Sequence, residues 1–261
     1  MDRKASKSAR IQLFFKCGCI ICSLLLIGFA FIRFVIPSVK ITTAEPERKI
    51  PIYCVDTDQK QVALSFDAAW GNEDTQRILE ILAENDVRAT FFMTGGWVES
   101  YPDDVKAIAA EGHDLGNHSE NHKQMSQLSA DSCCDELNQV HEKVLALTGI
   151  NMCLFRPPYG DYNNQLIESA QSLNYYTIQW SVDSLDWMDH TADEIVDTVL
   201  NHKNLKNGAI ILMHNGAEYT KDALPRIIAG LKEKGYALVP VSQLIYTENY
   251  HTDITGMQIR D

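Results

Sequence analysis

The stretch "LSFDAAWGNED", residues 64–74, begins inside an apolar run that predicts a buried strand over residues 61–67. The strand ends on a carboxylate, Asp67. Two alanines and a tryptophan follow it, where a polar site would be expected to continue. The stretch alone leaves two interpretations of Asp67 open: a catalytic group whose partner is missing, or a capping residue in a loop.

Strand-like and helix-like patterns alternate along the rest of the chain. The further strand-like runs cover residues 87–94, 113–117, 151–156, 175–183, 208–214 and 236–241. The helical patterns include "NEDTQRILEILAEN" (72–85), "YPDDVKAIAAEG" (101–112) and "SADSCCDELNQVHEKVLALTG" (129–149), and Thr191 and Thr220 are predicted caps of two later helices. Seven β/α steps without a break in composition predict one α/β domain, barrel-like, with about seven parallel strands. A doubly wound open sheet is the alternative, although no glycine-rich phosphate loop follows any strand.

The N-terminus combines a basic segment with an apolar one. Residues 1–16 hold five basic residues and one acidic residue, a net charge of +4, and residues 17–32 carry no charge. As a helix this run rises only about 24 Å against a hydrocarbon core of about 30 Å, but flanking apolar residues lengthen it. Because the basic flank stays in the cytoplasm, the pattern predicts a single-pass cell-membrane protein with its domain outside the cytoplasm. A signal peptide cleaved near "TTAEP" (42–46) is the alternative.

Five segments are therefore expected. They are a cytoplasmic basic tail (1–10), a transmembrane signal-anchor (11–37), a linker (38–60), the α/β domain (61–246) and a polar C-terminal tail (247–261).

Charge and cysteine spacing exclude other classes of protein. The whole chain carries −12, so residues 17–261 carry −16, which argues against a nucleic-acid partner. The exported cysteines have neither the spacing of a disulfide framework nor that of a metal site, and are predicted to be free thiols: Cys54, Cys133, Cys134 and Cys153.

Ionisable residues follow several of the predicted strands. In a β/α barrel the C-terminal ends of the strands form one face, so we expect these side chains to meet there: Asp67, His118, His122, Arg156, Asp183, Asp186 and His214. On a helical turn, the four-residue spacing of His118 and His122 would suit two ligands of one metal, although a pair of solvated histidines has the same spacing.

Two further segments suggest how the ionisable groups act on one another. In "FRPPYGDYN" (155–163) the two prolines fix the backbone after Arg156, and a rigid arginine near Asp67 would favour the ionised carboxylate. In "ILMHN" an apolar strand delivers His214, a candidate acid, and Asp183 or Asp186 could raise its pKa.

Five motifs now stand in order: "LSFDAAWG", "HSENH", "RPPYG", "DSLDW" and "ILMHN". With them, residues 61 to about 246 resemble the polysaccharide deacetylases of the NodB-homology group, most closely the sporulation-associated branch. The resemblance implies a deformed (β/α) barrel. It also implies metal-assisted removal of the acetyl group from N-acetylglucosamine-type residues of a cell-wall glycan, either peptidoglycan or a chitin-like polymer.

The resemblance also assigns roles by matching position. Asp67 would be the base, tuned by Arg156, and His214 the acid, tuned by Asp186. His118 and His122 would hold a divalent metal, zinc by preference, with cobalt, manganese or nickel as alternatives. The residues that would line the substrate groove are Tyr159, Trp187, Pro157, Leu212 and Trp70.

The chain departs from the family at one position. The first motif usually carries two consecutive aspartates, a base and a metal ligand, and here the second is Ala68. We therefore expect a weakly held metal. Three hypotheses stay open: an active deacetylase whose third ligand is Asp67, Asn72, Glu73, Asp74 or water; a glycan-binding pseudoenzyme; and a hydrolase of another ester or amide.

Overall fold

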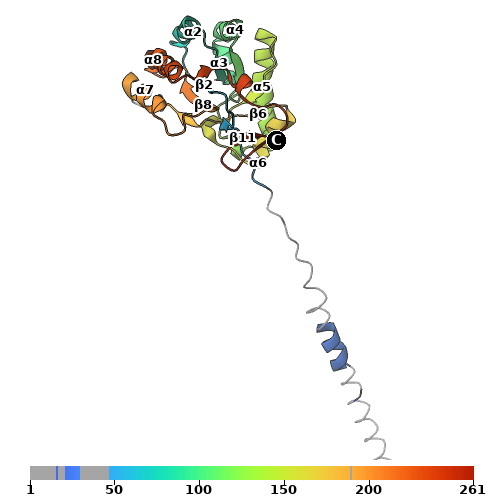
Figure 1. Cartoon of the computed structure of the whole chain (residues 1–261). Coiled ribbons are helices and arrows are strands. Elements are labelled where there is room, and N and C mark those ends of the chain that lie inside the picture. Colours follow the sequence, from blue (N-terminus) through green and yellow to red (C-terminus); the bar gives the residue numbers. More distant parts are fainter. Residues whose placement is uncertain (1–15, 17–20, 30–46, 189) are drawn as a thin grey trace, which may run out of the picture. The chain divides into compact units, whose positions relative to one another are not determined.

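The computed structural model describes residues 16, 21–29, 47–188 and 190–261 (Figure 1). The chain divides into two compact units, residues 1–47 and 48–261. In the first, residues 21–29 are helical. Among the residues described, no helix is both long and apolar enough to cross a membrane. Most of the predicted anchor, 11–37, lies outside the described residues, so the anchor stays a prediction.

The second unit is built on one curled sheet. Its strands are β1 (Cys54–Val55), β2 (Gln61–Ala68), β3 (Thr90–Met93), β4 (Asp114–Asn117), β5 (Leu154–Phe155), β6 (Tyr176–Thr177), β7 (Val182–Asp183), β8 (Ala209–His214), β9 (Ala237–Leu238), β10 (Tyr250–Thr252) and β11 (Met257–Arg260).

The strands curl into a deformed barrel. The main path through the sheet is β10-β11-β1-β8-β2-β3-β4-β5-β6, with β7 on β8 and β9 on β2. Every pairing from β8 through β2 to β6 is parallel. Beyond β6, a parallel bridge joins Ile178 to Ile52, two residues before β1. This bridge closes the path from β1 through β8 and β2 to β6 into a ring, which agrees with the predicted barrel rather than with an open sheet.

The sheet differs from the expectation in three segments. The predicted strand over 175–183 is two short strands, β6 and β7, separated by an irregular turn. The expected linker (38–60) contributes β1, and the expected polar tail (247–261) folds into β10 and β11, which pair antiparallel with each other. Polar side chains hide this last hairpin from a hydrophobicity pattern. Its one fully buried side chain is Gln258, which bonds the backbone N–H and carbonyl of Tyr246 at 2.8 and 2.7 Å.

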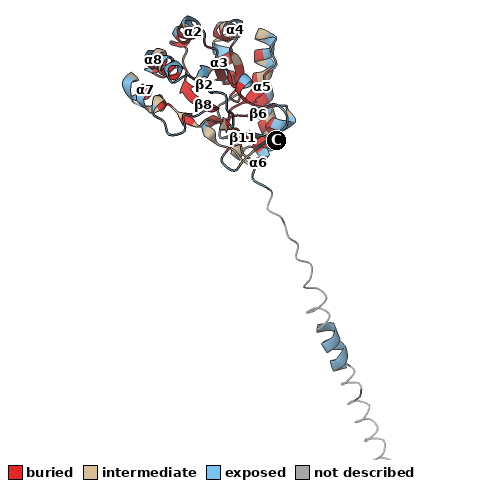
Figure 2. Cartoon of the chain, in the orientation of Figure 1, coloured by how far each residue is buried: buried red, intermediate tan, exposed pale blue. Residues whose placement is uncertain are grey.

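Helices cover the outside of the barrel (Figure 2). They are α2 (Thr75–Glu84), α3 (Gly95–Ser100), α4 (Pro102–Ala110), α5 (Ala130–Thr148), α6 (Asn164–Ser172), α7 (Ala192–Leu200) and α8 (Thr220–Glu233), with short 3-10 turns at Met125–Gln127 and Pro158–Gly160. The short helix α9 (Val241–Leu244) packs instead with inward-facing residues of the sheet such as Ala63.

Helix ends follow the predicted caps, with one exception. Ser129 caps α5, which stops at Gly149 in the left-handed region (φ 73°), and Thr191 forms a capping box at the start of α7. Thr220 is not a cap. It is the first residue of α8, and its hydroxyl donates instead to Asp186 at 2.6 Å.

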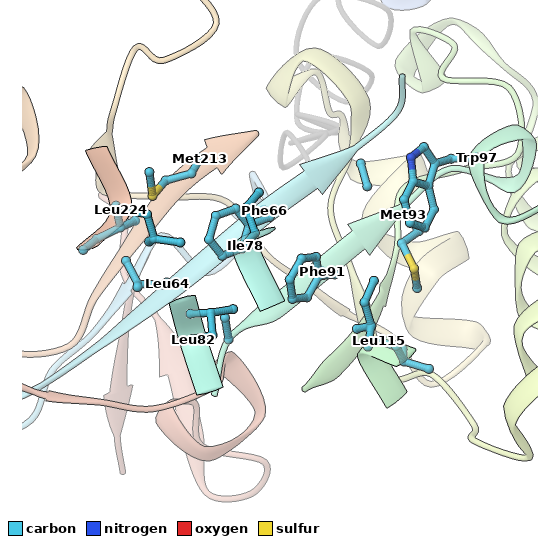
Figure 3. Close-up of a cluster of buried hydrophobic side chains, with 14 of the residues drawn as sticks. Leu64, Phe66, Ile78, Leu82, Phe91, Met93, Trp97, Leu115, Met213 and Leu224 are labelled. Carbon is cyan, nitrogen blue, oxygen red and sulfur yellow. The ribbon is translucent and has the colours of Figure 1, made fainter. Parts of the chain in front are cut away.

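Strand β2 shows how the sequence divides the core into two layers. Val62, Leu64 and Phe66 belong to the large cluster between sheet and helices, where Phe66 stacks on Phe91 (Figure 3). The alternate residues face the barrel interior, because successive side chains of a strand point to opposite faces. They run from Ala63, in a smaller apolar cluster, through Ser65 to Asp67. The interior therefore becomes polar toward the C-terminal end of the strand.

Candidate active site

A cavity of about 450 Å³ opens at the C-terminal ends of the strands. Eight of the predicted site residues line it: Asp67, Trp70, His118, His122, Tyr159, Trp187, Leu212 and His214. Arg156 and Asp186 lie behind this wall, 0% and 3% exposed. Pro157 is not among the lining residues; it positions the chain between Arg156 and Tyr159. Asp183, which was expected at this face, also lines the cavity, whereas sequence reasoning missed Trp180 as a wall residue.

Asp67 and Arg156 form a buried ion pair on one side of the cavity. Arg156 Nη1 donates to Asp67 Oδ1 at 2.7 Å. Burial by itself raises the pKa of Asp67. The charge of Arg156, followed by those of His118 and His214, outweighs this and brings the pKa below its usual range. Asp67 is therefore held as a carboxylate, with Oδ2 left outside the pairing with Arg156.

Arg156 is held through both terminal nitrogens of its guanidinium, whereas its buried Nε has no hydrogen-bond partner. Its Nη2 donates to Ser65 Oγ at 2.8 Å and to the carbonyl of Gln179 at 3.3 Å. Its guanidinium lies 4.1 Å from the ring centroid of Phe92 and 5.6 Å from that of Trp180. A fully desolvated guanidinium needs such partners, because an unpaired buried charge is costly. No periodicity in the sequence marked Ser65 or Gln179 as its partners.

His118 and His122 lie together, but on a loop rather than on the helical turn that their spacing suggested. Ser119 and His122 adopt left-handed conformations, with φ of 65° and 51°. The Nε2 atoms of the two histidines are 3.2 Å apart, and His118 Nε2 is 3.5 Å from Asp67 Oδ2. Burial lowers the pKa of His118 to about 4 and also lowers that of His122, so both rings are neutral near pH 7.

The two imidazoles suit two ligands of a divalent metal. His118 Nδ1 lies 2.7 Å from the carbonyl of Arg156, which can only accept, so Nδ1 carries the proton and Nε2 keeps its lone pair. The Nε2 atoms of the two histidines are 3.2 Å apart, which is roughly the separation of two ligand atoms that each lie about 2.1 Å from the same metal. Among the described residues, however, no three His, Cys, Asp or Glu side chains form a group that could hold a metal ion. The two imidazoles fit two ligands of a metal, and Asp67 Oδ2 lies 3.5 Å from His118 Nε2.

Three of the residues expected as substitutes for a ligand at residue 68, Asn72, Glu73 and Asp74, make contacts outside the cavity. Glu73 accepts from the backbone N–H of Asn72, and the amide of Asn72 donates to Asp104 at 2.7 Å. Asp74 accepts from the N–H of Gly216 through Oδ1. Neither Glu73 nor Asp74 lines the cavity.

His214 and Asp186 form the second charged pair, on the other side of the cavity. His214 Nδ1 lies 2.7 Å from Asp186 Oδ1, and its backbone N–H donates to Oδ2 at 2.8 Å. Thr220 completes the shell of the carboxylate. Burial lowers the pKa of His214, but the hydrogen bond and charge of Asp186 outweigh burial, so the net pKa is raised. Of the two candidates for this role, the structure selects Asp186; Asp183 accepts from the N–H of Leu185.

Aromatic side chains form the rim of the cavity. Trp70 stacks on His214 with centroids 5.7 Å apart, and Tyr159 packs edge-on against His122 at 4.6 Å. Trp70, Tyr159 and Trp187 are 45%, 65% and 56% exposed. Tyr159 also has a left-handed backbone (φ 60°) between the fixed Pro158 and Gly160. Exposed rings around a polar cavity are suited to stacking on flat, amphipathic ligands such as sugar rings.

Sequence comparison supports one family. The family model for polysaccharide deacetylase matches residues 55–178. Over 209 residues the chain is 36% identical to the uncharacterized protein YlxY of Bacillus subtilis, covering 80% of this chain and 64% of that protein. Over 194 residues it is 35% identical to a peptidoglycan-N-acetylglucosamine deacetylase of Bacillus cereus, covering 73% of this chain and 70% of the enzyme.

Structure comparison agrees and adds a second kind of relative. The fold matches the crystal structure of a CE4 family pseudoenzyme from Bacillus anthracis with a TM-score of 0.71 and 36% identity, over 74% of this chain and 68% of that one. A mutant of the same protein, described as having restored enzymatic activity, matches equally well at 38% identity. The chain belongs to the polysaccharide deacetylase family, hydrolases that remove N-acetyl groups from carbohydrates.

Proposed function

We propose that the protein hydrolyses the N-acetyl group of N-acetylglucosamine-type residues in a cell-wall glycan, either peptidoglycan or a chitin-like polymer. One observation carries the proposal. A single cavity holds an ionised carboxylate paired with Arg156 on one side and an imidazole of raised pKa paired with Asp186 on the other. This is the arrangement that a base and an acid need to act on the same amide.

The residues of the chain take complementary roles in this reaction. Asp67 removes a proton from the attacking water through Oδ2, and the new C–O bond forms at the acetyl carbon. His214 then donates its proton to the amine nitrogen as the C–N bond breaks, which releases acetate and a free amine. The backbone N–H of Tyr159 is the proposed donor to the oxyanion, and the rim aromatic residues orient the sugar. A divalent metal, held by His118 and His122, would polarise the acetyl carbonyl.

Acetate release from purified peptidoglycan and from chito-oligosaccharides, with and without added Zn²⁺, Co²⁺, Mn²⁺ or Ni²⁺, tests the proposal. We expect release that depends on metal. No release from either substrate with any of the four ions would reject the proposed activity.

A second candidate function is supported by a specific observation, the missing carboxylate at Ala68 together with the absence of a three-ligand group among the described residues. A pseudoenzyme would keep the aromatic rim and bind glycan without turnover. Retention on insoluble peptidoglycan, combined with no acetate release, would favour it over the deacetylase.

We expect the activity to fall as pH rises through the pKa of His214. Because Asp186 raises this pKa above the ordinary value of 6.5, the protonated acid is fully present below 6.5 and is lost only at higher pH. Asp186→Asn removes the charge that raises the pKa, so the alkaline limb of the rate profile should move to lower pH. The pair formed by His214 and Asp186 should also stabilise the fold. This contribution is complete below pH 6.5, the ordinary pKa of histidine, and is lost as the pH rises through the raised pKa of His214. An alkaline limb at the same pH in both proteins would show that His214 is not the acid.

We also propose that the domain is held on the outer side of the cell membrane by residues 11–37, as the basic flank and apolar run indicate. External protease added to intact, wall-less cells should digest the domain and spare an epitope placed on residues 1–10. Lysed cells serve as the control, in which both should be digested. A domain that survives in intact cells would overturn this localisation.

A further inference from the structure

The loop that carries the two histidines has little support of its own. Residues 118–124 form no helix or strand, and two of them, Ser119 and His122, have left-handed backbones. Such conformations cost free energy in residues other than glycine and persist only where the surroundings hold them. Ser119 holds part of the loop by accepting from the backbone N–H of His122 at 3.0 Å.

Groups outside the loop supply further support. The N–H groups of Gly95 and Gly96 donate to the carbonyls of Ser119 and Glu120 at 3.0 and 3.3 Å, and Glu136, on the buried face of α5, holds the part around His122. Glu136 is only 4% exposed. Its Oε2 accepts from the backbone N–H of Asn121 at 2.8 Å. Its Oε1 accepts from Asn121 Nδ2 at 2.8 Å and from Lys123 Nζ at 2.7 Å. All three bonds go to the residues immediately before and after His122.

The neighbouring residue on α5 holds the start of the same loop. The carbonyl of Leu137 accepts from Asn117 Nδ2 at 2.8 Å, and Asn117 Oδ1 accepts from the N–H of Ser119 at 2.9 Å. Two consecutive residues of one helix therefore fix the loop on both sides of its histidines. Helix α5 is 19 residues long and capped at both ends, so it is a rigid reference for this purpose.

The contacts of Glu136 with Asn121 and Lys123 explain why this buried side chain is charged. Burial raises the pKa of the carboxyl, but its bonds to Lys123 and Asn121 outweigh burial and lower the pKa, so the group is an anion at neutral pH. A buried carboxylate is costly unless it is fully bonded, and an apolar side chain at this position of α5 would pack as well against the core. Glu136 does not line the cavity.

We infer that Glu136 is a positioning residue, which fixes the loop so that the Nε2 atoms of His118 and His122 face each other 3.2 Å apart. Its link to a metal rests on the proposed function, whereas its hold on the loop does not.

Glu136→Gln tests the inference. The amide has the shape of the carboxylate, but its NH₂ group must face an N–H donor of Asn121 or the ammonium of Lys123, so at least one contact becomes repulsive. Asp135→Asn is the matched control, because it removes the same charge from an exposed position one residue earlier on α5. Both full-length proteins are compared with the parent by amide hydrogen exchange without metal and by titration with Co²⁺, whose visible absorption reports its ligands.

We expect Glu136→Gln to speed exchange of the amides of residues 119–123 by at least about tenfold, with exchange in the middle of α5 unchanged. Support of this kind typically changes metal affinity by 10–100-fold, so Co²⁺ binding should weaken by about that factor. Asp135→Asn should match the parent in both measurements.

Exchange over 119–123 that is unchanged in Glu136→Gln would overturn the inference, and so would faster exchange spread along all of α5, which would indicate a general structural role. The exchange measurement decides the question even if the parent proves to bind no Co²⁺ or to release no acetate. A failure of the proposed function is thereby distinguished from a failure of this inference.

Discussion

Asp67→Asn is expected to lower acetate release by about 10² or more, the factor typical for loss of a positioned base. The amide keeps the shape of the side chain and an oxygen that can accept from Arg156. It lacks the basic lone pair that takes a proton from water. The measurement is the initial rate of acetate release on the substrate that the parent hydrolyses best, with protein and metal held constant.

The same substitution has a second consequence, which serves as its control. Arg156 is completely buried, and neutralising Asp67 leaves its charge without a counter-ion. Breaking a buried pair costs roughly 3–5 kcal/mol, less where a hydrogen bond survives, so the unfolding temperature should fall while the protein stays folded at 25 °C. Retention on peptidoglycan should change little, because the rim residues are untouched. A rate within a few-fold of the parent would show that Asp67 is not the base.

Ala68→Asp is expected to tighten metal binding by at least about 10–100-fold, since a ligand bonded directly to the metal should matter no less than the groups that support ligands. Ala68 is the last residue of β2 and follows Asp67, the position at which the family usually carries its second aspartate. In the parent, chelator should remove any bound metal quickly without unfolding the protein, because the barrel core does not depend on the site.

The stability of Ala68→Asp should depend on metal, whereas the stability of the parent should not. Residue 68 is fully buried, so an aspartate there is destabilising unless it binds a cation. Saturating metal should therefore raise the unfolding temperature of Ala68→Asp, and chelator should lower it. Ala68→Asn, which has the same shape without the charge, is the control and should gain much less affinity. Tight metal in the parent that survives prolonged dialysis against chelator would contradict this account of the site.

The barrel and most of the cavity could be predicted from the sequence because both depend on local signals. Apolar runs such as that of β8 mark strands buried on both faces, and residues at the ends of parallel strands meet at one edge. Asp67, His118 and His214 were found in this way. As partners of His214, Asp183 and Asp186 were equivalent from the residues alone, because they lie only three residues apart. The family resemblance assigned Asp186, and the structure shows its hydrogen bond to His214.

The remaining features arise from contacts between distant segments, which have no local signature. Thr220 resembled a helix cap because threonine is common at the starts of helices. Its hydroxyl instead donates to Asp186, which lies 34 residues earlier in the chain. The spacing of His118 and His122 suggested a helical turn, whereas the pair is created by a strained loop held from α5. The strand β11 could not be recognised because its buried side chain, Gln258, is polar.

The pairing of β1 with β11 determines where this domain can be cut. Its first and last strands lie side by side and parallel, with Cys54 opposite Met257 and Val55 opposite Gln258. A chain shortened after Tyr246, where the family resemblance ends, would lose the two bonds from Gln258 and leave one side of β1 unpaired. Open strand edges template association with other chains, so the shortened protein should aggregate for reasons unrelated to its chemistry. Residues 247–261, which look dispensable in the sequence, therefore provide the strand that pairs with β1.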